Sequence, residues 1–244
     1  MLESIFKNMQ PVVKNLLIIN VLFFLATTVF AAQGIDLNRT LGLFYIAAED
    51  FRPYQLATHF FMHGGLWHIF FNMFGLVVFG NVLERIWGAK RFLIFYFVTA
   101  IGAASLHQVI MGIEIYQISG EFFPDFQRLN ELITVKNGMI SYPRALSHMV
   151  DVWEIGQIPT VGASGAIYGL LMAVAMLFPN TTVYLYFAIP VKMKWLALGL
   201  GAYAIIQGIQ DAPGDSVAHF AHLGGMLFAF ILIKIWQKDK RNFY

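Results

Sequence analysis

Long runs of apolar residues, separated by short polar segments, dominate this chain. A run of about 20 apolar residues can cross the ~30 Å hydrocarbon core of a bilayer as a helix. Five such runs lie at approximately 12–32, 66–86, 91–112, 193–211 and 217–236. A sixth, shorter run covers 164–178 and stops at Pro179. The pattern predicts an all-α membrane protein with six spans, of which the fourth is short and buried.

The composition agrees with a membrane protein. Hydrophobic residues make up 58% of the 244 residues and charged residues 12%, against roughly 45–50% and ~25% in soluble domains. A soluble domain of this size cannot bury so much apolar surface, and disordered chains do not contain it. The chain has no cysteine, which excludes disulfides and cysteine-based catalysis or metal sites. A net charge of +2 gives no reason to expect nucleic acid.

The basic residues are distributed unevenly between the two sides of this six-span arrangement. The side that holds both termini carries Lys7, Lys14, Arg85, Lys90, Arg91, Lys192, Lys194, Lys234, Lys238, Lys240 and Arg241. The opposite side carries only Arg39, Arg52, Arg128, Lys136 and Arg144. Because Lys and Arg favour cytoplasmic loops, we expect both termini in the cytoplasm. Short loops and the lack of a presequence favour a bacterial-type cell membrane.

Two long segments are expected on the outer side of the membrane. The segment 33–65 is rich in aromatic residues and is expected to lie partly in the membrane interface. The segment 113–161 is more polar, and a short amphipathic helix is predicted from Asp125 to Val135. Since no internal repeat or second domain is indicated, residues 1–244 are predicted to form a single domain.

The short fourth run places a serine inside the membrane. From Ser164 to Pro179 a helix rises only ~22 Å, less than the thickness of the hydrocarbon core. The glycine-rich backbone around Ser164 is tolerated at that depth only if it is buried in protein or lines a water-filled cavity. We therefore expect a pocket with Ser164 at its floor. A simple helix cap or helix-packing motif would also explain the Gly-Ala-Ser-Gly sequence.

Other polar residues of the spans fall at a similar depth. Counted from Arg85 and Lys234, the basic residues at the inner ends of the two spans, Asn72 lies ~20 Å and His222 ~18 Å above the inner face. His68 lies one turn from Asn72 on the same helix face. Since polar residues inside spans are costly and usually functional, the shared depth predicts one site that contains Ser164, His222, Asn72 and His68.

These residue types fit a nucleophilic reaction. A serine hydroxyl becomes a nucleophile when a neutral imidazole accepts its proton, which makes His222 the candidate base for Ser164. No carboxylate of the sixth span lies where it could orient His222, so a dyad is expected rather than a triad. Tyr168 could stack on the imidazole. The backbone N–H of Ser164, with His68 and Asn72, could donate to an oxyanion, although Asn72 could instead hydrogen-bond between helices.

A stripe of small residues follows His222. It consists of Gly224, Gly225 and Ala229. Small residues allow two helices to approach closely. The stripe therefore favours a sixth span that packs against the fourth.

Four motifs of the chain resemble those of the rhomboid intramembrane serine proteases. They cover approximately residues 10–236 in the order found in that family. The segment 63–73 resembles the H-x4-H-x3-N signature, 162–165 the G-x-S-G motif, 221–225 the A-H-x-x-G motif, and Glu84 with Gly88 the E-x3-G motif. The resemblance implies a six-helix bundle that cleaves single-span membrane proteins in or near their transmembrane segment, without a cofactor or metal.

The resemblance also implies roles for individual residues. Ser164 matches the nucleophile and His222 the general base, while His68 and Asn72 match oxyanion contributors. The supporting positions are Tyr168, Gly162, Gly165, Gly225, His63 and Glu84, of which His63 and Glu84 match structural hydrogen-bonding residues. Transmembrane substrates and the lipid bilayer are the implied partners. The oligomeric state is left open.

The chain departs from the family pattern at three places. Tyr54-Gln55 stands where many members have Trp-Arg, Ala229 replaces a glycine, and 113–161 is longer than in minimal bacterial members.

Two other functions are alternatives to a protease. A catalytically silent rhomboid-like binding protein or chaperone would need the pocket without the dyad. A metal transporter or metalloprotease would use a set of five histidines: His59, His63, His68, His219 and His222. Against this alternative, the chain has no H-E-x-x-H motif.

Overall fold

The structure is a computed structural model that describes residues 9–136, 138–185, 188–210 and 216–238. This part of the chain is predominantly helical. Within it, three helical segments are long and apolar enough to cross a membrane: Pro11–Ala31, Leu66–Ser119 and His219–Lys238. Ser164–Leu177 is a shorter apolar helix. The predicted helical membrane fold is confirmed at this level. Four residues that were used in the predictions of topology and spans lie outside the described residues: Lys7, Asp211, Lys240 and Arg241.

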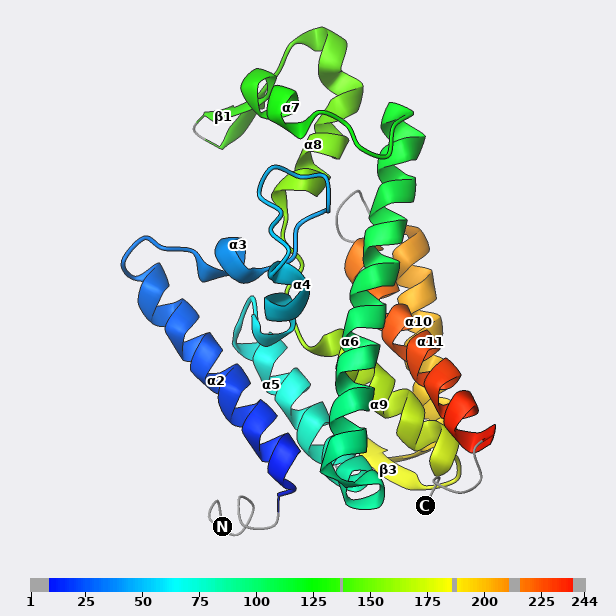
Figure 1. Cartoon of the computed structure of the whole chain (residues 1–244). Coiled ribbons are helices and arrows are strands. Elements are labelled where there is room, and N and C mark those ends of the chain that lie inside the picture. Colours follow the sequence, from blue (N-terminus) through cyan, green and yellow to red (C-terminus); the bar gives the residue numbers. More distant parts are fainter. Residues whose placement is uncertain (1–8, 137, 186–187, 211–215, 239–244) are drawn as a thin grey trace.

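The long helices run side by side in the lower part of Figure 1, with a smaller group of elements above them. In chain order the helices are α2 (Pro11–Ala31), α3 (Leu37–Leu41), α4 (Gln55–Thr58), η1 (His59–Phe61), α5 (Leu66–Gly75), the π-helix η2 (Leu76–Gly80), α6 (Asn81–Ser119), α7 (Phe126–Leu132), η3 (Arg144–Met149), α8 (Val150–Gln157), α9 (Ser164–Leu177), α10 (Met193–Gln210) and α11 (Ser216–Lys238).

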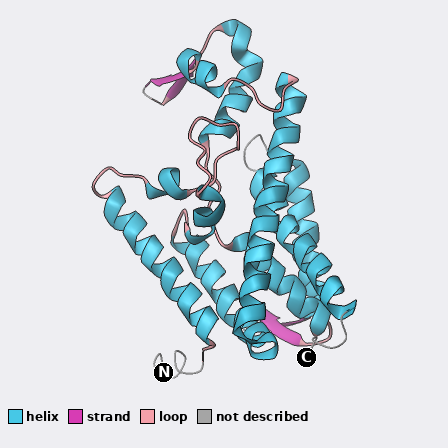
Figure 2. Cartoon of the chain, in the orientation of Figure 1, coloured by secondary structure: helices cyan, strands magenta, loops and turns pink. Residues whose placement is uncertain are grey.

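Two antiparallel hairpins lie at opposite ends of the molecule (Figure 2). The upper hairpin pairs β1 (Thr134–Lys136) with β2 (Met139–Ser141). The lower hairpin pairs β3 (Thr182–Leu185) with β4 (Ile189–Lys192) and connects α9 to α10. Both hairpins are short, and the core is formed by helices.

The second and third expected spans form one helical segment that reverses at Gly88. The backbone there has φ 74° and ψ 165°, which favours glycine. Figure 1 shows α5 descending to this point and α6 rising from it. The helix does not end with the predicted third span at about residue 112, because α6 continues to Ser119. From Gly88 to Ser119 a helix rises ~46 Å, so its upper end extends beyond a ~30 Å hydrocarbon core.

The projecting end of α6 carries a cap, which we define as residues 121–157. Phe126 of α7 and Ile155 of α8 pack with Ile115 of α6 and with Phe44 and Tyr45 from the first long segment into one apolar cluster. The aromatic residues of 33–65 were expected in the membrane interface. Phe44 and Tyr45 are instead buried in this cluster, because the cap covers them. The helix predicted at Asp125–Val135 corresponds to α7, where the Asp125 carboxylate accepts from Arg128 N. Its predicted end is wrong, because α7 ends at Leu132 and Val135 pairs with Ile140 in the β1–β2 hairpin.

The lower end of α2 is fixed by a side chain of α6. The Glu84 carboxylate accepts hydrogen bonds from Val12 N at 2.9 Å and Val13 N at 2.8 Å. These are N–H groups of the first helical turn, which have no partner inside their own helix. Asn81 Oδ1 accepts from Gln10 N at 2.7 Å in the same way. Glu84 thus joins the first helix to the α5–α6 hairpin.

Glycines allow α9 to pack closely between α6 and α11. A Cβ atom on Gly165 of α9 would lie 2.4 Å from Ala103 Cβ of α6. A Cβ atom on Gly225 of α11 would lie 1.9 Å from the carbonyl oxygen of Gly165. Both distances are shorter than any side chain tolerates. Within the small-residue stripe of the sixth span, Gly225 therefore lies directly against the start of the fourth, as the sequence predicted, whereas Gly224 lies against Ala103 and Leu106 of α6.

Candidate active site

Three helices enclose an open pocket at the first residue of α9. Its volume is about 350 Å³. Helix α9 contributes Ser164, Ile167 and Tyr168, α11 contributes His222, and α5 contributes Trp67, His68, Phe71 and Asn72. The four residues that were expected at one depth therefore line one pocket.

The hydroxyl of Ser164 contacts the imidazole of His222 across 58 residues of chain. The distance from Ser164 Oγ to His222 Nε2 is 2.8 Å. Since a neutral imidazole has one N–H and one acceptor nitrogen, the hydroxyl can donate to Nε2 when the proton is on Nδ1. His222 Nδ1 is buried and has no hydrogen-bond partner among the described residues. Among the described residues, no carboxylate therefore accepts a hydrogen bond from the imidazole behind this contact.

Aromatic contacts hold the imidazole where a carboxylate would otherwise orient it. The Tyr168 ring stacks on the His222 ring with centroids 4.2 Å apart and an interplanar angle of 3°. The His219 ring meets the His222 ring edge to face, with centroids 6.2 Å apart. Tyr168 is four residues after Ser164, so the same helix positions the hydroxyl and the stacking ring.

The backbone before Ser164 rests against His68. Gly162 has φ 121°, which L side chains rarely adopt, and a Cβ atom there would lie 2.6 Å from His68 Nε2. The His68 ring in turn meets His63 edge to face, with centroids 5.1 Å apart. Burial lowers the pKa of His63 to about 4, so this side chain is neutral at pH 7. Gly162 and the two histidines therefore set the position of the loop that leads to Ser164.

Asn72 is buried and directs its amide toward its own helix. Its Nδ2 donates to the His68 carbonyl oxygen at 2.9 Å. This bond lies within α5, whereas the alternative role considered for Asn72 was a bond between helices. An amide has two N–H groups, so one of them remains for a ligand in the pocket.

A second, smaller cavity of about 40 Å³ lies behind Ser164, and sequence reasoning missed it. His59, His107 and Thr160 line it, and His107 Nε2 contacts Thr160 Oγ1. Burial lowers the pKa of His59 to about 4. The backbones of Leu43 and Thr160 exchange two hydrogen bonds of 2.9 and 2.8 Å. His107 could have been noticed as a polar residue inside a predicted span. Nothing in the sequence indicated that its partner, Thr160, lies in a distant loop.

Some predicted residues lie outside the pocket. Glu84 caps α2 at the far end of the bundle, and Gly225 acts through helix packing. For the metal-binding alternative, the described residues contain no group of three or more His, Asp or Glu side chains that could hold a metal ion.

Comparison with known proteins gives a consistent result. A family model described as "Rhomboid domain" matches residues 50–238. The chain is 29% identical over 242 residues to RHOMBOID-like protein 12, mitochondrial, of Arabidopsis thaliana, covering 96% of this chain and 60% of that protein. It is 25% identical over 233 residues to Rhomboid-like protein 16, chloroplastic, of the same plant, covering 95% and 63%. The chain thus spans less than two thirds of the length of these relatives.

Proposed function

The chain belongs to the rhomboid family, and we propose that it is an intramembrane serine endopeptidase. Its substrates would be single-span membrane proteins, cleaved in or near their transmembrane segment. The observation that carries the proposal is the 2.8 Å contact between Ser164 Oγ and His222 Nε2 in an open pocket of a helical membrane protein. A serine so placed beside a neutral imidazole can attack a carbonyl carbon.

The first half of the proposed reaction forms an acyl-enzyme. Ser164 Oγ bonds to the carbonyl carbon of the scissile peptide while its proton moves to His222 Nε2. The carbonyl oxygen becomes an oxyanion, which accepts hydrogen bonds from the Ser164 backbone N–H and from His68 and Asn72. When the intermediate collapses, the C–N bond breaks and the leaving amine takes the proton from His222.

The second half hydrolyses this ester. A water molecule gives a proton to His222 Nε2 as its oxygen bonds to the acyl carbon. The C–O bond to Ser164 then breaks, and Ser164 Oγ recovers the proton from His222. Throughout, the stacked Tyr168 ring keeps the imidazole plane fixed, so His222 needs no carboxylate to hold its orientation.

The proposal includes the membrane arrangement. Helices α2, α5, α6, α9, α10 and α11 would be the six spans, with α9 as the short one and the cap on the outer side. The distribution of Lys and Arg supports a cytoplasmic location for both termini in a bacterial-type cell membrane. The names of the two relatives assign those proteins to mitochondria and chloroplasts. Accessibility of single introduced cysteines to a membrane-impermeant reagent tests the sidedness.

A cleavage assay tests the activity. Wild type, Ser164→Ala and His222→Ala are purified in detergent and incubated with a single-span substrate that has small, helix-breaking residues near its outer end. We expect both variants to lose at least about a thousandfold in rate. Ser105→Ala, an exposed serine on α6, is the matched control and should cleave normally. Cleavage that survives Ser164→Ala would exclude Ser164 as the nucleophile. Inactive wild type would favour the silent binding protein.

A further inference from the structure

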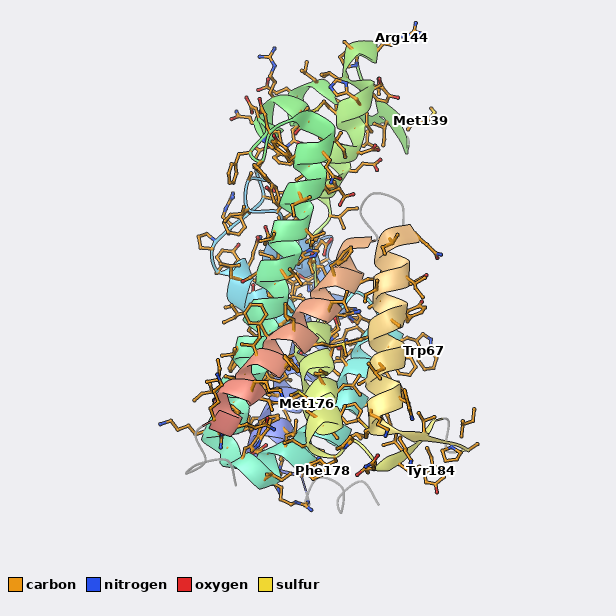
Figure 3. All side chains as sticks on the ribbon, turned by 90° about the vertical axis from the view of Figure 1, so that its right-hand side faces the viewer. Trp67, Met139, Arg144, Met176, Phe178 and Tyr184 are labelled. Atoms are coloured by element: carbon orange, nitrogen blue, oxygen red, sulfur yellow. The ribbon has the colours of Figure 1, made fainter. Side chains whose placement is uncertain are left out.

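An apolar groove runs along α10 on the side that faces α9 and α11. Its volume is about 440 Å³. Small residues of α10 form its floor, namely Ala197, Gly201 and Ala202, and Met172, Met176, Leu223 and Met226 form its walls. Leu198 and Ile205, which are 62% and 47% exposed, flank its opening. Figure 3 shows α9 between α10 and α11, with Met176 near the lower end of α9.

The dimensions of the groove fit one hydrocarbon chain. From Lys194 to Ile205 the helix rises ~16 Å, which is about half of the ~30 Å hydrocarbon core and thus the depth of one leaflet. The groove therefore extends over about the depth of one leaflet, which is the depth that an acyl chain of a phospholipid occupies.

The end of the groove carries a positive charge at headgroup depth. Lys194 is the one charged residue among the lining residues, and it lies in the first turn of α10. That turn lies at the end of the molecule where α2 begins and α11 ends (Figure 1). The Lys194 ammonium lies 5.5 Å from the ring centroid of Trp195, which is 60% exposed. Tryptophan and lysine beside each other are typical of the bilayer interface, and anionic headgroups attract such a lysine.

We infer that this groove binds one acyl chain of an anionic phospholipid, with the lipid phosphate at Lys194. The lipid belongs to the leaflet on the side where α2 begins. The upper end of the acyl chain lies beside Leu223, the residue after His222, and beside Met172, which is one turn below Tyr168. The bound lipid thus fills the space between α9 and α10 directly below the candidate site. This inference needs the helical membrane fold and not the proposed protease activity.

Photo-crosslinking in vesicles tests the inference. The full chain is reconstituted in phosphatidylcholine vesicles that contain a trace of phosphatidylglycerol with a photoactivatable acyl chain, and labelled residues are mapped by mass spectrometry. We expect label on Met172, Met176 or Met226, and less label when the probe is phosphatidylcholine with the same chain. Lys194→Gln should remove this preference for the anionic probe. Equal labelling of the groove by both probes would overturn the role of Lys194.

Two glycines of α10 provide a matched pair of variants. A Cβ atom on Gly201 would meet Met226 at 3.5 Å, so Gly201→Leu extends a side chain into the groove and should abolish the labelling. A Cβ atom on Gly199 meets nothing within 4 Å, so Gly199→Leu should leave the labelling unchanged. If Gly201→Leu fails to fold, Ala202→Phe replaces it. The proposal would be overturned if the groove were still labelled in a folded Gly201→Leu or Ala202→Phe variant. It would also be overturned if the exposed face of α2 were labelled as strongly as the groove.

Discussion

At the scale of single residues, the site depends on groups that orient His222 and Ser164 without a carboxylate. In the described part of the chain, the stacked Tyr168 ring is the contact that fixes the plane of the imidazole. Gly162 and His68 fix the loop that leads to the hydroxyl. Removing one of these contacts should change the reaction rate without removing a reacting atom.

The stacking ring of Tyr168 matters more than its hydroxyl in this account. Tyr168→Phe keeps the ring and should leave kcat/KM nearly unchanged. Tyr168→Ala removes the ring and lets the imidazole rotate, which should lower kcat/KM by about a hundredfold, the cost of a misplaced catalytic group. Steady-state kinetics on one substrate compare the two. If Phe were as damaging as Ala, the hydroxyl rather than the stack would be the contribution of this residue.

Gly162 has both a positive φ, which would strain any other residue, and a close contact with His68. A variant of Gly34, which has a positive φ but no such contact, separates the two effects. Gly162→Ala forces an L residue to φ 121° and brings a methyl group against His68, so we expect a loss of ~1–3 kcal/mol in stability and a large loss of activity. Gly34, at φ 80°, has no atom within 4 Å of its Cβ position. Gly34→Ala should therefore cost stability alone. Thermal unfolding and cleavage rate, measured on both variants, separate the two effects, and similar activities would contradict the contact with His68.

At the scale of elements, sequence pattern predicted where helices run but not where all of them end. The apolar runs indicated the helices because only helices satisfy the backbone in lipid. The extension of α6 to Ser119 was missed because residues 113–119 mix Ile115 with polar residues such as Glu114. Ile115 is covered by apolar residues of the cap that lie 11 or more positions further along the sequence, from Phe126 onward. Tertiary packing, not hydropathy, therefore decides the end of α6.

The contact between α9 and α11 should be the least tolerant of the helix contacts. Gly225→Ala places a methyl group 1.9 Å from the Gly165 carbonyl oxygen, so the helices must separate. We expect a loss of ~1–3 kcal/mol in stability, as for other overpacked sites, together with a longer Ser164–His222 distance and slower cleavage. Gly199→Ala, which meets open space on α10, is the control. Normal activity of a folded Gly225→Ala variant would contradict the packing described here.

The Glu84 carboxylate should stabilise the start of α2 from across the bundle. Glu84→Gln keeps the shape of the side chain but has only one acceptor oxygen, so one of the two hydrogen bonds that Glu84 accepts, from Val12 N and from Val13 N, is lost. We expect a loss of ~0.5–2 kcal/mol, the range for removal of a helix cap, with little change in the cleavage rate per folded molecule. Unfolding in mixed micelles measures the loss. Glu131→Gln, an exposed residue of the cap, should cause none.

At the scale of the whole molecule, the cap, the first long loop and the segment before Ser164 form one connected structure. Leu43 of the loop pairs with Thr160, and the Gly162 N–H donates to the His59 carbonyl oxygen at 2.9 Å. The similar depth of Ser164, Asn72 and His222 on three predicted spans allowed us to predict from sequence that these side chains gather in one pocket. The cap and the small cavity behind Ser164 could not be predicted, because both arise where loops far apart in sequence meet.

The central claim is that Ser164 is a nucleophile activated by His222, and covalent labelling tests it most directly. Wild type in detergent is treated with a fluorophosphonate, which reacts with activated serines, and the modified residue is located by mass spectrometry. The account predicts a single adduct at Ser164 and its loss in His222→Ala, while Ser105→Ala is labelled as wild type. An adduct on another residue, or unchanged labelling of Ser164 in a folded His222→Ala variant, would contradict it.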